Sequence, residues 1–136
     1  LLRRYPFPVF AQEKYMPEDV VWMQMSGPYR MVHINRNIYI CEYLEGGLTN
    51  TGRNMKIRSP KGMVLRSETY LHDKKVCFRV RCKMMILYII YGHFAGYGRK
   101  ELLARVPGKG LCLALWLPSC LMYLIWRKKY LVTVQP

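Results

Sequence analysis

Apolar and polar residues alternate along two stretches of the chain. Between Met31 and Tyr43 apolar side chains fall on alternate positions with one interruption at Arg36, and the same period of two returns between Lys75 and Lys83. A strand whose two faces meet different surroundings shows this period, because successive side chains point to opposite faces. The alternation predicts a half-buried strand at each place, although the first stretch could also fold into two short strands at Asn35–Asn37.

A turn signal lies between Met55 and Arg66. Pro60 suits the first central position of a type I turn, and Gly62 can take the left-handed conformation that closes a three-residue hairpin loop. Lysine and arginine flank this turn on both sides. The stretch therefore predicts a β-hairpin with cationic edges, preceded by a loop of glycine and polar residues at Gly46–Asn54.

The apolar residues that follow come in continuous runs rather than in alternation. Met84–Tyr91 is wholly apolar or aromatic, and Leu111–Trp126 is a run of sixteen residues without charge. The first run fits a buried strand that continues from the preceding one. We expect the second run to be helical after Gly110 and kinked at Pro118, with a last short strand at Leu131–Val134.

The run Leu111–Trp126 leaves two interpretations open. A helix needs about 20 residues to cross a bilayer core and about 17 at least, so sixteen residues fall just short and Gly110 makes the count marginal. Trp126 and the cations Arg127–Lys129 border the run as an interfacial aromatic and a positive anchor would. The alternatives are a membrane anchor over residues 110–126 and a helix buried in protein.

The first seventeen residues combine three prolines with aromatic residues. Because proline fixes φ and lacks a backbone donor, this segment predicts an extended arm that lies either on its own core or on a neighbouring subunit. Together these elements predict an α+β fold: a small basic antiparallel sheet with an extended N-terminal arm and an apolar C-terminal helix. Residues 1–19 would form the arm, 20–83 a basic β-rich domain, and 84–136 an apolar region with a basic connecting loop.

Composition adds a strong charge imbalance. The 136 residues include 22 Lys and Arg against 8 Asp and Glu, a formal net charge of +14, while 51% of the residues are hydrophobic. Self-repulsion at this charge disfavours the compact state unless a polyanion or an anionic surface opposes it. RNA, DNA or an acidic membrane face is therefore the expected class of partner.

The cations concentrate in the predicted hairpin and strand and in the connecting loop. Such faces can follow a phosphate backbone, and Tyr70 and Phe78 could stack on bases if they are exposed. The predicted RNA-binding residues are Arg53, Lys56, Arg58, Lys61, Arg66, Lys74, Lys75, Arg79, Arg81, Lys83, Arg99, Lys100, Arg105 and Lys109.

Residues with catalytic or metal-binding chemistry form no recognisable signature. The five cysteines include no CxxC pair, and the spacing of His72, Cys77 and Cys82 fits no common zinc pattern. His93 in its apolar run is expected to be a core histidine. The glycine-rich stretch around Lys109 lacks the serine or threonine of a phosphate-binding loop. We expect no enzymatic activity, metal, cofactor or small-molecule substrate.

These observations favour a structural, non-catalytic subunit of an organellar ribosome that contacts rRNA and neighbouring ribosomal proteins. We expect the organelle to be the mitochondrion. The chain begins at Leu1 rather than at methionine, as a processed organellar protein or a trimmed chain would. The alternative is an accessory subunit of a mitochondrial inner-membrane respiratory or ATP-synthase complex. In that case residues 110–126 would anchor the chain beside other membrane subunits and anionic lipid.

Overall fold

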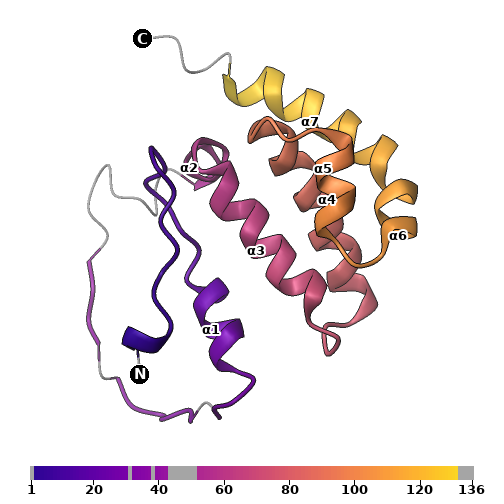
Figure 1. Cartoon of the computed structure of the whole chain (residues 1–136). Helices are drawn as coiled ribbons and strands as arrows, with labels where there is room; N and C mark the ends of the chain where they lie inside the picture. Colours follow the sequence, from indigo (N-terminus) through magenta and orange to yellow (C-terminus); the bar gives the residue numbers. More distant parts are fainter. Residues whose placement is uncertain (1, 31, 38, 43–51, 132–136) are drawn as a thin grey trace.

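A computed structural model describes residues 2–30, 32–37, 39–42 and 52–131, and their regular structure is helical (Figure 1). The elements are η1 (Leu2–Arg4), α1 (Asp19–Met25), α2 (Gly52–Arg58), α3 (Pro60–His72), α4 (Phe78–Phe94), α5 (Arg99–Arg105), α6 (Lys109–Ala114) and α7 (Trp116–Leu131). None of the described residues belongs to a β-strand. The predicted α+β fold with an antiparallel sheet is therefore wrong.

Helix α4 forms the centre of the molecule and packs against α3, α6 and α7. Tyr88, Ile89 and Ile90 are fully buried, and Met85 and Tyr91 are almost so. These neighbouring positions point in several directions around the helix axis, and a helix that is apolar all round is expected to be buried. The run Met84–Tyr91 is thus the core helix of the protein, not the buried strand that its continuous apolar character suggested.

The strand expected over Lys75–Lys83 is instead the first part of α4 and the turn before it. Its apolar residues do not share a buried face: Phe78 is 69% exposed and Val80 is only partly buried. The helix belongs to a longer pattern in which Met84, Met85, Tyr88 and Ile89 recur at intervals of three and four residues. The predicted boundary between residues 83 and 84 falls inside this continuous helix.

The hairpin expected between Met55 and Arg66 is a junction of two helices, because α2 ends at Arg58 and α3 begins at Pro60. Proline suits the first position of a helix, where its missing N–H has no partner in any case. The buried stripe of α3 is formed by Met63, Val64, Ser67 and Leu71 at helical spacing. Because Ser67 is polar, this stripe is not visible in the pattern of apolar residues. The Ser67 hydroxyl can be buried because it donates to the Met63 carbonyl oxygen at 3.0 Å.

The helix expected after Gly110 is present, but it is divided into α6 and α7. The break lies at Leu115 and not at Pro118, which occupies the first turn of α7. Proline cannot donate to the carbonyl of residue i−4, here Ala114, and its ring crowds that carbonyl. A chain that ends α6 at Ala114 and starts α7 at Trp116 avoids this conflict.

The N-terminal arm folds back onto its own chain, along one side of α3 (Figure 1). The Glu13 carboxylate accepts the backbone N–H of Lys61 at 2.8 Å and of Gly62 at 2.9 Å, at the start of α3. A negative charge there is favourable because the first N–H groups of a helix lack internal partners. The Tyr15 N–H adds a bond to Ser59 Oγ at 3.2 Å.

Three further expectations fall wholly or partly outside the described residues. Of the strand expected over Met31–Tyr43, residues 32–37 and 39–42 are described and form neither strand nor helix. The expected loop Gly46–Asn54 is described only from Gly52, where α2 begins. The expected strand Leu131–Val134 is described only at Leu131, the last residue of α7.

Candidate nucleic-acid interface

The fourteen cations predicted to bind RNA do not form one strip. They divide into groups on α2 and the start of α3, around the turn between α3 and α4, and on α5 and α6, with Arg66 alone in the middle of α3. The thirteen residues of α3 place about 20 Å between its two ends. The continuous cationic face of the expected sheet is therefore replaced by separate surfaces.

Arg66 serves the fold rather than the solvent-facing surface. Its Nε donates to Asp19 Oδ2 in an ion pair that joins α3 to α1, and the Tyr70 hydroxyl donates to the same oxygen at 3.1 Å. Both charged side chains are about three-quarters covered, at 25% and 28% exposure. Tyr70 is thereby engaged and only partly exposed, so it lacks the free face that base stacking needs.

Two other predicted cations lie on aromatic rings of α7. The Arg53 guanidinium lies 4.4 Å from the Trp126 ring centroid and donates to the Tyr130 hydroxyl at 3.2 Å, which joins α2 to α7. Arg99 lies 5.4 Å from the ring of Trp116. These cation–π contacts stabilise the packing of α7.

Arg105 lies in a local charge cluster. It pairs with Glu101 at 2.9 Å and approaches Glu68 at 3.7 Å, with the Tyr97 ring centroid 4.5 Å from its guanidinium. Burial raises the pKa of Glu68, against the lowering effect of Arg105. The positive charge of Arg105 therefore serves largely to offset the negative charges of Glu68 and Glu101.

The turn between α3 and α4 differs from these places because its exposed cations make no ion pair and no aromatic-ring contact with the described residues. Lys74 and Lys75 lie in the turn, and Arg79 and Lys83 lie one helical turn apart at the start of α4. Helical side chains lean toward the N-terminus of their helix, so Arg79 and Lys83 reach toward the turn. We call Lys74, Lys75, Phe78, Arg79 and Lys83 the turn surface.

Two interactions fix the shape of the turn beneath this surface. Asp73 Oδ1 accepts the Lys75 backbone N–H at 2.8 Å, which is the local bond of an aspartate turn. Arg81 reaches back from α4 and donates to the Asp73 carbonyl oxygen at 3.0 Å. Arg81 is accordingly half-buried and structural, while the cations beside it remain turned to solvent.

The exposed apolar residue of the turn surface is Phe78, the first residue of α4. Its ring is 69% exposed among four cations. A large aromatic ring that stays in water forgoes the free energy that its burial would contribute. Next to positive charge, such a ring offers a surface on which a base can stack. Of the two aromatic residues predicted to stack on bases, Phe78 thus has the exposure and Tyr70 does not.

The remaining predicted cations are dispersed, and all but Lys56 are exposed. Arg58 and Lys61 flank the junction of α2 and α3, Lys100 lies in the first turn of α5, and Lys109 begins α6. Lys56 is half-buried and lines a cavity. They add to the general positive field without forming a defined surface.

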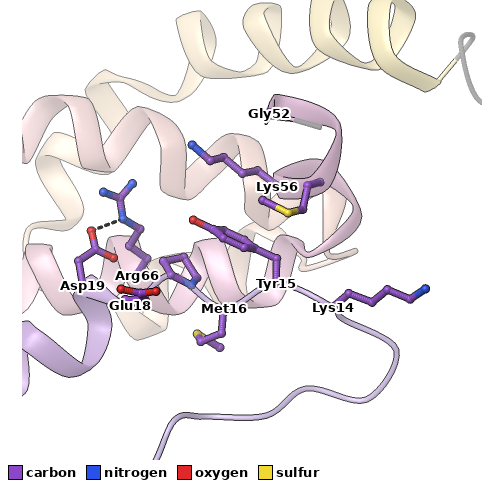
Figure 2. Close-up of a pocket in the computed structure, with 10 residues that line it drawn as sticks. Lys14, Tyr15, Met16, Glu18, Asp19, Gly52, Lys56 and Arg66 are labelled. Carbon is purple, nitrogen blue, oxygen red and sulfur yellow. Dashed lines mark hydrogen bonds and ion pairs between the residues drawn. The ribbon is translucent and has the colours of Figure 1, made fainter. Parts of the chain in front are cut away.

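A cavity of ≈ 650 Å³ lies between the arm and helices α2 and α3 (Figure 2). Its lining is mixed in charge, with Lys56 and Arg66 near Glu18 and Asp19, while Lys14 points away from the others. Its lining holds neither histidine nor cysteine. The Asp19–Arg66 pair at its edge is already matched in charge.

The buried titratable groups form a packed interface between α4 and α7. The His93 ring lies 5.1 Å from the Tyr123 centroid and 5.5 Å from that of Trp116, with Nε2 3.5 Å from Cys120 Sγ. Burial lowers the pKa of His93 and raises that of Tyr91 to about 12. Both side chains are therefore neutral at pH 7 and act as packing groups.

Two other kinds of site, metal centres and membrane-spanning helices, are lacking in the described part of the chain. No group of three or more His, Cys, Asp or Glu side chains there could hold a metal ion. Within the same ranges, no helix has both the length and the apolar character needed to cross a membrane.

Sequence reasoning missed two features that organise these surfaces. Glu13 caps α3 from the arm, and Arg53 joins α2 to the ring of Trp126. Each contact joins residues more than forty positions apart, so no local pattern could have revealed it. Comparisons of the chain with family models, with curated proteins and with solved structures found no match.

Proposed function

We propose that this protein is a structural, non-catalytic subunit of an organellar ribosome, that of the mitochondrion, and that it contacts rRNA through the turn surface. One observation carries the proposal: four exposed cations and an exposed phenylalanine lie within residues 74–83, at a turn whose only acid, Asp73, is used in backbone bonding. Arginine and lysine bind phosphate oxygens, and an exposed ring stacks on an unpaired base.

The distribution of charge supports a polyanionic partner over the whole molecule. Formal charge reaches +14, and among the described residues Arg66 and Arg105 form ion pairs with acids. Exposed cations without acids raise the free energy of the isolated chain by mutual repulsion, and a phosphate backbone relieves this repulsion while releasing its counterions. Contacts of this kind position a protein on RNA without reading its sequence.

Binding of a fluorescently labelled RNA hairpin with an unpaired loop tests this proposal directly. We expect the triple variant Lys74→Glu, Lys75→Glu, Arg79→Glu to weaken affinity about tenfold or more. We also expect it to reduce the slope of log affinity against log salt by about two to three, since each lost phosphate contact removes about 0.9. Fluorescence anisotropy at several salt concentrations measures both quantities.

The matched control removes the same amount of charge elsewhere. Arg3→Glu, Arg4→Glu, Arg36→Glu alters three exposed cations outside the turn surface and should leave most of the affinity in place. Equal losses in the two triple variants would show that charge acts diffusely and would refute the turn surface. A wild-type chain that fails to bind RNA near physiological salt would refute RNA contact as a whole.

Phe78 provides a second test that does not change charge. Truncation by Phe78→Ala should lower affinity for a hairpin with an unpaired loop, because stacking on an aromatic ring contributes about 1–3 kcal/mol per base. Binding to a continuous RNA duplex should stay the same, since its bases are already stacked. Equal affinity of the variant and the wild type for both RNAs would show that Phe78 is not part of the interface.

A further inference from the structure

Helix α7 exposes a row of large apolar side chains on the side that faces away from α4. Leu117 is 81% exposed, Leu121 62%, and Leu124 and Ile125 56% each. At 100° per residue these four positions fall within about 120° of one another around the helix axis. We call them the outer face of α7. It lies at the edge of the helical bundle, on the far side from the N-terminal arm (Figure 1).

The opposite side of the same helix is already in use. Ser119 is buried, and Trp116, Tyr123 and Trp126 pack against α4 through His93, Phe94 and Tyr91. The inner and outer sides of α7 are thus both apolar, although the chain covers only the inner one. Apolar side chains arranged in one stripe and left in water indicate an interaction surface.

Positive charge borders the outer face of α7. Lys128 lies in line with the four apolar residues, one turn beyond Leu124, and the exposed Arg127 lies beside it. After Glu101 the sequence contains no Asp or Glu up to its end at Pro136. The partner of this face must therefore offer an apolar layer next to negative charge.

We propose that the outer face of α7 docks on an anionic lipid membrane, with the helix lying in the plane of the interface. Apolar side chains on one side of such a helix enter the acyl boundary while lysine and arginine contact the headgroups. Lys128 can extend its long side chain to the headgroup level while its methylene groups stay in the apolar layer. The inference does not depend on RNA contact, because α7 and the turn surface share no residue.

The dimensions of the face favour lipid over a second protein. The stripe from Leu117 to Ile125 is about 12 Å long, because a helix rises about 1.5 Å per residue. A stable protein interface buries about 800 Å² on each partner and needs complementary shape, which a single short stripe on a convex helix does not supply. A membrane requires no complementary shape and adds attraction for every nearby cation.

Flotation of the nuclease-treated full chain with lipid vesicles tests this proposal. We expect it to float with vesicles of phosphatidylcholine and phosphatidylglycerol and far less with phosphatidylcholine alone. Leu121→Glu, Ile125→Glu should reduce the bound fraction about tenfold or more, because it places two charges in the apolar layer. Val9→Glu, Val32→Glu is the matched control: it adds the same charges at exposed valines outside the helices and should retain binding.

Three outcomes would overturn the proposal. Absence of the wild-type chain from anionic vesicles would do so, as would equal binding by the α7 variant and the wild type, which would indicate charge attraction alone. A chain that ignores vesicles but forms a dimer in analytical ultracentrifugation, dissociated by the α7 variant, would show that a second copy covers the face. The RNA affinity of the α7 variant should stay unchanged, which separates this test from that of the turn surface.

Discussion

Helices α4 and α7 are nearly equal in length, with 17 and 16 residues, and both are mainly apolar, yet the chain covers them very differently. Helix α4 is enclosed by α3, α6 and α7, whereas among these neighbours α7 packs only on α4 and α6. Tyr88 is fully buried in α4, while Leu117 of α7 is 81% exposed. Similar sequence runs thus play different roles, since one forms the core of the chain and the other leaves Leu117, Leu121, Leu124 and Ile125 exposed.

The largest expected effect contrasts a core position with an exposed one. Ile89→Ala in α4 should lower the free energy of unfolding by about 2–5 kcal/mol, because it leaves a cavity in a fully buried site. Leu121→Ala on the outer face of α7 should change it by about 0.5 kcal/mol or less in the isolated chain. Denaturant titration measures both values. Similar losses in the two variants would mean that α7 is covered within the chain itself.

A smaller effect is expected where α5 packs on α4. A Cβ atom at Gly92 would lie 2.6 Å from Leu102 Cδ2, and Leu102 is fully buried, so its side chain must shift within the core. Gly92→Ala should therefore destabilise the fold by about 1–3 kcal/mol in the same titration. Gly110→Ala in α6 is the matched control, since nothing lies within 4 Å of its Cβ position and alanine favours a helix. Equal stability of the two variants would contradict close packing at Gly92.

The anchoring of α3, which covers one side of α4, provides a third test. Glu13→Gln removes the charge that accepts two N–H groups at the start of α3 and should cost about 1 kcal/mol. Hydrogen exchange should also become faster in the arm, because that contact holds it to the helix. Glu42→Gln alters an exposed glutamate outside the helices and should leave both measurements unchanged. An unaffected arm in Glu13→Gln would show that other contacts hold it.

The smallest expected effect concerns pH at the contact between α4 and the inner side of α7. Burial lowers the pKa of His93 below its ordinary value of 6.5, so the unfolded chain binds this proton more readily than the folded chain. The stability that neutral His93 supports is complete above about pH 6.5 and is lost as pH falls through the lowered pKa.

Comparison with His93→Gln isolates this contribution from that of Glu68, whose raised pKa acts in the opposite direction at lower pH. Between about pH 7.5 and about pH 5.5 the free energy of unfolding should fall more steeply in the wild type than in the variant. Denaturant titrations at the two pH values provide the measurement. Parallel curves would show that His93 titrates as it does in the unfolded chain.

The sequence correctly indicated an apolar C-terminal helix and misled over the middle of the chain. Alternation over the nine residues from Lys75 to Lys83 resembled a strand because that window ends just before the buried helical stripe begins at Met84. In α3 the polar Ser67 occupies a buried position, so the helical period was not visible in hydropathy. Pro60 and Gly62 fit both a hairpin turn and a helix start, and long-range packing decides between them.

The candidate interface was predictable in residue type but not in arrangement. Lys74, Lys75 and Arg79 are exposed as an RNA-binding surface requires, whereas Arg53 and Arg66 contact Trp126 and Asp19 of the same chain. Net charge leads us to expect a polyanionic partner, and this expectation needs composition alone. Which cations remain for that partner depends on acids and rings brought near by the fold, and local sequence does not contain that information.

Sedimentation of a native extract, with and without ribonuclease, tests the central claim that this chain belongs to an RNA-containing assembly. The extract is prepared with detergent, so that attachment to membranes through α7 does not determine the result. We expect the chain to migrate with a large particle and to move to light fractions once the RNA is digested. Migration that stays the same after complete digestion would contradict membership of an RNA-containing assembly.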